Sequence, residues 1–62
     1  MYTLENWSRY RVGRKEYIQG NIEYMDGTQD SLMVSVFSID DNYTEVVTDC
    51  GEVFRLGKRY GV

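Results

Sequence analysis

Apolar residues recur at every second position in the middle of this chain, and this spacing restricts the fold to β-strands more than any other feature. In residues 17–24, Ile18, Ile22 and Tyr24 share one face, with Gly20 between them. Such alternation predicts a half-buried strand. Gly20 inside the strand predicts a bulge or a sharp bend, which small barrels need at their corners.

The same pattern predicts three further strands, over residues 31–39, 43–48 and 53–56. The first of these is apolar on both faces, so we expect it to be central or to change face through a bulge. Asp26-Gly27 is the turn signal before it. Asp40-Asp41-Asn42 is the signal after it, because such side chains hydrogen-bond their own backbone.

The last two strands form a hairpin through residues 49–52, where Gly51 is free to take a positive φ. If Cys50 and Gly51 are the two loop residues, Val47 lies opposite Phe54 and points into the core. A three-residue loop would shift the register by one residue and exchange the faces. With the first register, the predicted core consists of Leu32, Val34, Val36, Ile18, Ile22, Val47, Phe54 and Leu56.

The two ends of the chain allow more than one interpretation. Residues 3–7 are compatible with a short helical turn, capped by Asn6 or Ser8. Residues 9–12 alternate and are compatible with a fifth strand. The tail, residues 57–62, is punctuated by glycine, and we expect it to be partly disordered.

Sixty-two residues make one domain at most, so we assign residues 1–62 to a single small β domain. One cysteine and no histidine exclude an internal disulfide and remove the commonest zinc ligand. We predict an all-β fold, a small antiparallel meander of four to five strands that closes into an SH3-like or OB-like barrel. An open sheet packed by the N-terminal helical turn is the alternative, and a homodimer that pairs strand edges is compatible with this size.

Charge is segregated along the chain. All Lys and Arg residues lie within residues 9–15 and 55–59, and all Asp and Glu residues except Glu5 lie between these two clusters. Charge distribution selects partners and association rates. An acidic surface suits a basic groove on a protein partner. The predicted residues of this acidic surface are Asp26, Asp30, Asp40, Asp41 and Glu45.

The basic clusters favour a different ligand. Aromatic and basic residues interleave at both ends of the chain, and a closed barrel can make its terminal strands neighbours, which would merge the clusters. This mixture suits single-stranded nucleic acid, because bases stack on aromatic rings while Arg and Lys hold phosphates. The sequence pI of about 4.7 argues against it, since nucleic-acid-binding domains tend to be basic. The residues of this alternative are Trp7, Arg9, Tyr10, Arg11, Arg14, Lys15, Arg55, Lys58, Arg59 and Tyr60.

Catalytic chemistry has little support in the sequence. Histidine, the commonest general acid or base, is absent. The paired carboxylates Asp40-Asp41 and Asp49/Glu52 lie in predicted turns, where Asp is expected for its hydrogen bonds alone. Cys50 lies between acidic residues, which disfavours a reactive thiolate. The spacing of Asp26, Thr28 and Asp30 lacks the calcium-loop pattern. We therefore predict no enzyme activity, no metal and no cofactor.

No apolar run approaches the roughly 18 residues of a membrane span. The first residues also lack the basic-then-apolar order of a signal peptide. A single cysteine is compatible with a reducing compartment. We therefore predict a cytoplasmic protein without a membrane partner.

Two segments of the chain, Asp26-Gly27-Thr28 and residues 48–57, resemble a pattern in small phage and prophage β-proteins that have no established activity. Those proteins carry a Trp, then Asp-Gly, then a Thr-x-Ser/Cys-Gly-x-x-Tyr/Phe-x-Leu-Gly ending, and Trp7 holds a comparable place here. The resemblance implies a mobile-element context and transfers no site residue.

We predict a non-enzymatic small binding module that acts by protein–protein interaction, for example by inhibiting a host factor. A β-barrel that binds single-stranded nucleic acid through the terminal Arg and Tyr clusters is the alternative.

Overall fold

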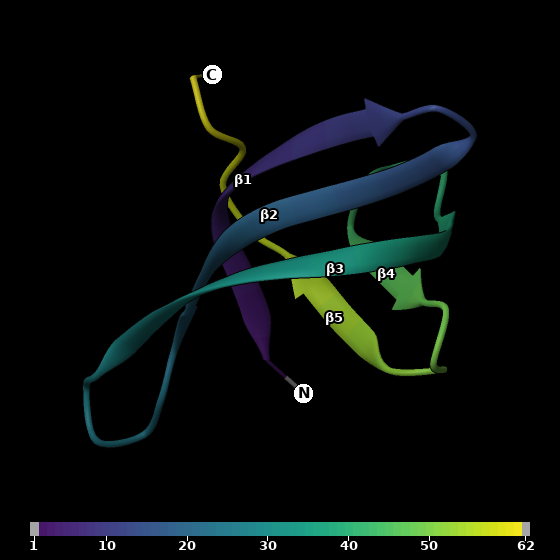
Figure 1. Ribbon diagram of the computed structural model, residues 1–62. Coiled ribbons are helices and arrows are strands. Elements are labelled where there is room, and N and C mark those ends of the chain that lie inside the picture. Colours follow the sequence, from purple (N-terminus) through teal and green to yellow (C-terminus); the bar gives the residue numbers. More distant parts are fainter. Residues whose placement is uncertain (1, 62) are drawn as a thin grey trace.

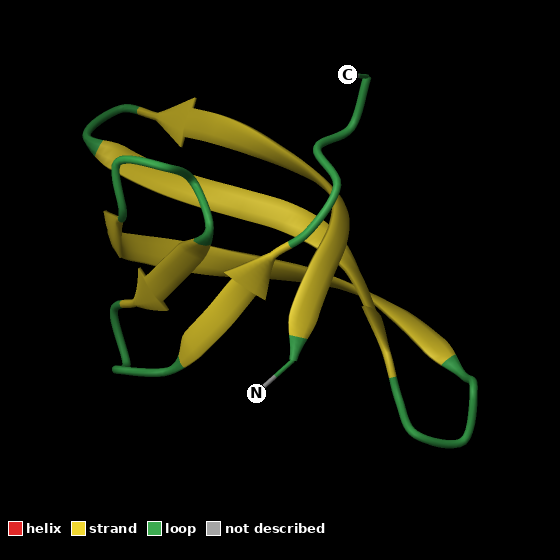
Figure 2. Ribbon diagram, turned by 180° about the vertical axis from the view of Figure 1, so that it is seen from behind, coloured by secondary structure: helices red, strands yellow, loops and turns green. Residues whose placement is uncertain are grey.

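Alternating apolar and polar residues build five strands in the part of the chain that the computed structural model describes, residues 2–61 (Figures 1 and 2). The strands are β1 (Thr3–Val12), β2 (Lys15–Glu23), β3 (Gln29–Ile39), β4 (Glu45–Thr48) and β5 (Val53–Leu56). They close into a barrel in chain order, and each consecutive pair is antiparallel. A short parallel pairing of β1 with β5 completes the barrel.

The architecture confirms the predicted all-β fold, a meander that closes into a small barrel of the SH3-like or OB-like kind. No helix occurs in residues 2–61, and so no helix there is long and apolar enough to cross a membrane. The predicted N-terminal helical turn is wrong, because residues 3–7 belong to β1 and pair with both β2 and β5.

A bulge bends β1 in its middle. Asn6 and Trp7 of β1 together face the single residue Gly20 of β2, and Asn6 takes a positive φ of 51°. A Cβ atom on Gly20 would lie 3.2 Å from the Glu5 carbonyl oxygen and 3.2 Å from the Cβ atoms of Leu4 and Trp7. Glycine thus lets the bent strand approach closely. The bulge predicted at Gly20 exists, but it lies in the neighbouring strand.

This bulge decides which side chains of β1 enter the core. Leu4 and Trp7 are an odd number of residues apart, so a regular strand would point them to opposite faces. The extra residue shifts the alternation, and both side chains are buried, Leu4 at 0% and Trp7 at 2% exposure. A second register shift, between Val36 and Ser38 of β3, likewise changes the inward face and leaves Phe37 exposed.

The β4–β5 hairpin takes the three-residue loop. The amide of Thr48 donates to the carbonyl of Glu52 over 2.8 Å, and Gly51 has a positive φ of 89°. Val46 therefore lies opposite Phe54, and the register is one residue from the two-residue loop that placed Val47 in the core. A type I turn followed by a left-handed glycine is a favoured form of this loop, and Gly51 meets its requirement.

The C-terminal segment is not a loose tail. The amide of Gly57 donates to the Leu4 carbonyl, and the amide of Tyr60 donates to the Trp7 carbonyl, each over 2.9 Å. The indole Nε1 of Trp7 donates to the Gly57 carbonyl over 3.0 Å. The expectation of disorder is therefore wrong for residues 57–60, because their backbone continues the pairing with β1. Val62 lies outside the described residues.

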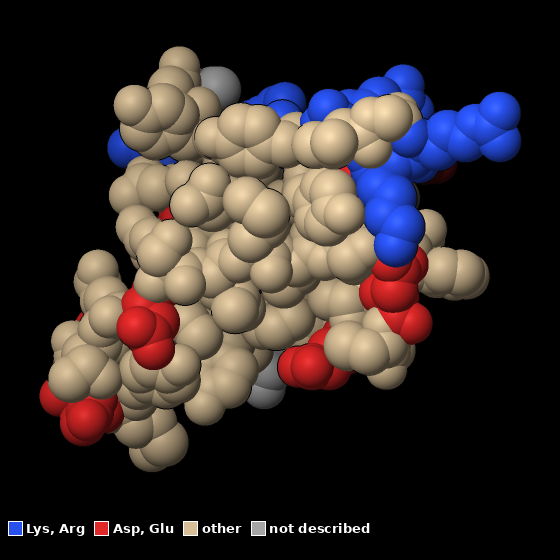
Figure 3. All heavy atoms as spheres, viewed as in Figure 1, with Lys and Arg blue, Asp and Glu red and all other residues tan. Residues whose placement is uncertain are grey.

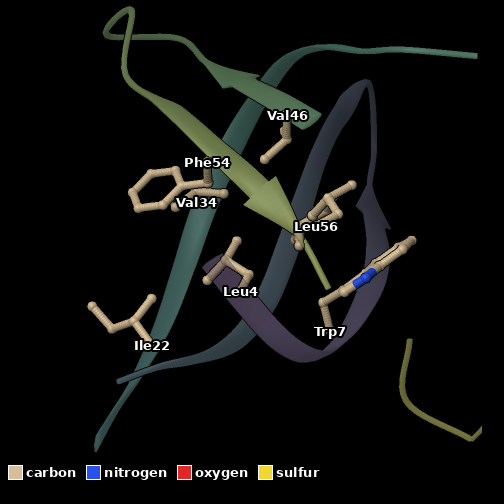
Figure 4. Close-up of a cluster of buried hydrophobic side chains, with 8 residues drawn as sticks. Leu4, Trp7, Ile22, Val34, Val46, Phe54 and Leu56 are labelled. Carbon is tan, nitrogen blue, oxygen red and sulfur yellow. The ribbon is translucent and has the colours of Figure 1, made fainter. Parts of the chain in front are cut away.

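One cluster of apolar side chains fills the barrel (Figure 4). Its buried members are Leu4, Trp7, Ile18, Ile22, Val34, Val46, Phe54 and Leu56. Leu32 and Val36, which we also predicted in the core, are half-buried and pack against this cluster. Val46 replaces the predicted Val47. Residues 9–12 do form part of a strand, as their alternation indicated, but Leu4 and Trp7 were missed because residues 3–7 were interpreted as a helical turn.

The register of the β4–β5 hairpin can be tested with two neighbouring valines. Val46→Ala should lower the free energy of unfolding by about 2 kcal/mol, since it removes two buried methyl groups and leaves a cavity. Val47→Ala should cost less than about 1 kcal/mol, because Val47 is only half-buried. Urea unfolding followed by circular dichroism measures both. A larger loss for Val47→Ala would instead indicate the two-residue loop.

Candidate functional site

Closure of the barrel brings the two basic clusters of the sequence together. Trp7 of β1 forms a parallel bridge with Arg59 of the C-terminal segment. The Arg59 guanidinium carbon lies 5.0 Å from the centroid of the Trp7 ring, which is a cation–π contact. Arg59 also lines a depression of about 330 Å³, together with Arg9, Tyr10, Arg11 and Glu16. The expected merging of the clusters is therefore present at this position.

An aromatic stack fixes the cations on one side of this depression. The rings of Trp7 and Tyr43 are nearly parallel, with centroids 6.3 Å apart and an interplanar angle of 16°. The guanidinium carbons of Arg9 and Arg59 lie 5.8 Å and 5.9 Å from the Tyr43 ring centroid. Each cation–π contact contributes about 0.5–1 kcal/mol at exposed sites, so the stack orients these side chains more than it stabilises the fold.

Tyr43 is the residue of this site that the sequence did not identify. It takes a positive φ of 57°, an uncommon conformation for a bulky side chain. Its amide donates to the Asp40 carbonyl over 3.0 Å, and its ring is held against Trp7. The only sequence signal is an aromatic residue directly after the Asp40-Asp41-Asn42 turn, which we interpreted as the beginning of a strand.

Arg9 is held in place by Glu16. The two side chains form a bidentate ion pair, with nitrogen–oxygen distances of 2.6 Å and 3.0 Å. Arg9 Nη1 also donates to the Tyr43 hydroxyl over 3.2 Å. The hydrogen bond to Glu16 raises the pKa of Arg9, and the hydrogen bond from Arg9 lowers the pKa of Glu16. Because exposed ion pairs contribute little stability, the main effect of this pair is to position the guanidinium.

The other cations near Arg9 are not neutralised. Within residues 2–61, the Arg9–Glu16 contact is the only ion pair. Lys and Arg side chains gather over the β1–β2 hairpin, at the upper right of Figure 3. Tyr10 and Tyr60 beside them are 47% and 70% exposed. We call this region the basic–aromatic surface, and its residues are Arg9, Tyr10, Arg11, Arg14, Lys15, Arg59 and Tyr60.

Three residues of the predicted nucleic-acid set lie outside this surface. Trp7 is buried, and its ring makes a cation–π contact with Arg59. Arg55 lies on β5, in the register position opposite Glu45. Lys58 is exposed, and its amide donates to a Glu5 side-chain oxygen over 2.8 Å.

A larger groove of about 530 Å³ adjoins the basic–aromatic surface. Arg11, Arg14 and Lys15 form one wall, and the opposite lining includes Asp41 and Asp49. Phe37, which the β3 bulge turns outward, is 73% exposed in the same groove. The groove therefore offers positive charge, negative charge and an exposed ring to one ligand.

The predicted acidic surface does not form one patch. Asp26 and Asp30 lie at the β2–β3 turn, whereas Asp40 and Asp41 lie at the opposite end of β3. Ten residues of strand correspond to a separation of up to about 33 Å. Glu45 begins β4 and faces Arg55 of β5. The residues are close in sequence, but the long β3 strand places them at two ends of the barrel.

Two of these carboxylates serve their own turns. Asp40 accepts hydrogen bonds from the Thr44 hydroxyl and from the amides of Thr44 and Glu45. Asp26 accepts from the hydroxyl and the amide of Thr28. In both cases the side-chain hydrogen bond is the largest cause of a lowered pKa of the carboxyl group. Their position is thus explained by local structure.

Residues 2–61 contain no group of three or more His, Cys, Asp or Glu side chains arranged to hold a metal ion. Cys50 is exposed, and its sulfur lies 3.1 Å from the Thr48 hydroxyl oxygen. Comparison with protein-family models, with curated proteins and with solved structures finds no match to this chain.

The turn role of Asp40 makes stability depend on pH. The folded-state pKa of Asp40 is lowered below its ordinary value of 3.8, so its contribution is present above that pH and is lost as pH falls through the folded pKa. Asp40→Ala should lower the melting temperature at neutral pH. It should also reduce the loss of stability that the native protein shows on acidification below about pH 4. Thermal unfolding followed from pH 7 to pH 2 measures both effects.

Asp41→Ala is the matched control, because hydrogen bonds of the turn go to Asp40 alone. Equal effects of the two substitutions at neutral pH would contradict the capping role.

Proposed function

We propose that this protein binds single-stranded nucleic acid through the basic–aromatic surface. The observation that carries the proposal is the meeting of β1 with the C-terminal segment, which places Arg59 beside Arg9 and Arg11. The choice differs from our first interpretation because the acidic residues are dispersed while the basic ones converge.

The surface offers both kinds of contact that a single strand uses. Arg11, Arg14, Lys15 and Arg59 make no ion pair with a carboxylate within residues 2–61 and are available to phosphates. Tyr10 and Tyr60 line one further depression, of about 380 Å³. Tyr10 also lines the smaller depression that holds Arg9, Arg11 and Arg59. Exposed rings of this kind stack on bases without regard to sequence. Phe37, in the adjoining groove, adds a third ring.

The acidic net charge does not oppose this use of the surface. The formal charge is −3, and three of the acids, Glu23, Asp26 and Asp30, lie in the β2–β3 hairpin, away from the β1–β2 hairpin. Four others, Glu16, Asp40, Asp41 and Asp49, line the groove beside the basic–aromatic surface. Charges separated by more than about 8 Å are largely screened at physiological ionic strength. Glu16 is paired with Arg9, so a phosphate would approach Arg11, Arg14, Lys15 and Arg59 from the side away from these carboxylates.

Fluorescence anisotropy with a labelled single strand of about 12 nucleotides tests the proposal. Four phosphate contacts predict a slope of about −3 in a plot of log affinity against log salt concentration. Arg11→Glu combined with Arg59→Glu should weaken binding at least roughly tenfold, because two contacts are replaced by repulsion. Tyr10→Ala combined with Tyr60→Ala should weaken it at least roughly thirtyfold, since each of two stacked bases contributes about 1–3 kcal/mol.

Arg55→Glu is the matched charge control, because Arg55 lies on β5 outside the surface. A duplex of the same sequence serves as the control ligand, since its bases cannot stack on Tyr10 and Tyr60. Binding that falls equally with Arg55→Glu, or no binding at low salt, would refute the proposal.

The β2–β3 hairpin supports a second candidate function, docking on a basic groove of a protein partner. This hairpin extends beyond the barrel in Figure 1, and residues 23–30 carry three acids and no base. Met25 at its turn is fully exposed and offers an apolar anchor. A phage-type inhibitor of a host protein would act in this way, as the resemblance to phage proteins implies.

Capture of a partner from a host lysate by the native protein tests this candidate. Glu23→Lys combined with Met25→Ala should abolish capture, because both changes remove exposed contacts of the hairpin. Asp41→Lys at the other end of β3 should leave capture unchanged. Equal losses would place the contact elsewhere.

A further inference from the structure

Two strands of the barrel have an edge that no strand within residues 2–61 covers. β1 pairs with β5 and the C-terminal segment only up to Trp7, so residues 8–12 pair with β2 alone. β3 pairs with β4 only from Val36 onward, so residues 29–34 pair with β2 alone. Each free edge presents backbone amides and carbonyls that can extend a sheet.

The two free edges are complementary in charge. The β1 edge carries Arg9 and Arg11 and no acid, whereas the β3 edge carries Asp30 and no base. Arg11 lies opposite Glu16, and Arg9 opposite the buried Ile18, so both arginines are on the inward face of the sheet. Asp30 lies opposite the buried Ile22, on the same face. In a continued sheet, side chains of one face lie next to each other.

Apolar surface lies beside both edges. A depression of about 380 Å³ follows the β3 edge and is lined by Leu32, Val34 and Phe54. Met33 on this edge is 55% exposed. On the β1 edge, Tyr10 and Val12 are 47% and 68% exposed. An incoming strand would therefore find both hydrogen-bonding groups and apolar contacts.

We infer that the β1 edge of one copy pairs with the β3 edge of a second copy, so that the protein associates head to tail. Pairing of two β1 edges would bring arginines of both copies together, which like-charge repulsion disfavours. A head-to-tail contact joins different surfaces, so it leaves one free edge at each end of a dimer. Association therefore continues to a closed ring or a longer chain. The inference does not require the proposed nucleic-acid binding.

Sedimentation velocity without nucleic acid tests the association. The native protein should exceed the monomer mass of 7.3 kDa as concentration rises, and its association should weaken with salt. Arg11→Glu and Asp30→Lys should each weaken association by roughly tenfold, because each places like charges opposite one another. Asp41→Lys, which changes the net charge equally but lies outside both edges, should leave association unaffected.

The charge-swapped double variant decides whether Arg11 and Asp30 face each other across copies. Arg11→Glu combined with Asp30→Lys in one chain should restore association, since the pair is reversed but complementary. An equimolar mixture of the two single variants should also regain it. Loss of fold cannot produce this rescue, and circular dichroism of each variant confirms that it is folded.

Hydrogen exchange gives a second readout that does not depend on mutation. Amides in residues 8–12 and 29–34 should become better protected as protein concentration rises, whereas those of β5 should not change. A protein that stays at monomer mass at every concentration would overturn the inference. So would a dimer that grows no further and is insensitive to Arg11→Glu, because that behaviour indicates a two-fold contact between β3 edges.

Discussion

The fold depends on the way Trp7 closes the barrel. Its side chain enters the core because the bulge at Asn6 and Trp7 shifts the alternation of β1, and Gly20 gives the bent strand the room to approach. The indole then donates to the Gly57 carbonyl, while its ring supports Arg59 and stacks on Tyr43. One residue thus joins the first strand, the last segment and the β3–β4 turn. Without it, the parallel closure would rest on a short pairing of β1 with β5.

Closure of the barrel brings the two basic clusters of the sequence together into the basic–aromatic surface. Basic residues at two ends of the chain become neighbours, because the terminal strands of a closed barrel lie side by side. The acidic residues, which are continuous in sequence, are instead distributed to opposite ends by the long β3 strand. Charged residues that cluster along the chain therefore do not necessarily cluster in the folded protein. For this reason we assign the proposed binding site to the basic residues and not to the acidic ones.

The same bends that close the barrel also leave it incomplete. One half of β1 pairs with both β2 and β5, and one half of β3 pairs with both β2 and β4. The other half of each strand pairs with β2 alone. In a chain of 62 residues, which has little core to spare, such edges are either protected by charge or used for association. The opposite charges on the two edges favour association, and they favour pairing of a β1 edge with a β3 edge. Binding of nucleic acid and association both involve the Arg11 side chain, and association also uses the backbone edge of β1.

The sequence alone determined the fold class, the strand β5 and most of the core, because period-two alternation and turn residues act over a few neighbours. It left the β4 register open, since one loop residue decides whether Val46 or Val47 faces inward. It indicated residues 9–12 of β1 as a candidate strand, but not residues 3–7, where Leu4 and Trp7 break the alternation and are reconciled only by a bulge against Gly20. Contacts such as Trp7 with Arg59 and Tyr43 join residues distant in sequence, so only the tertiary structure decided where the site lies.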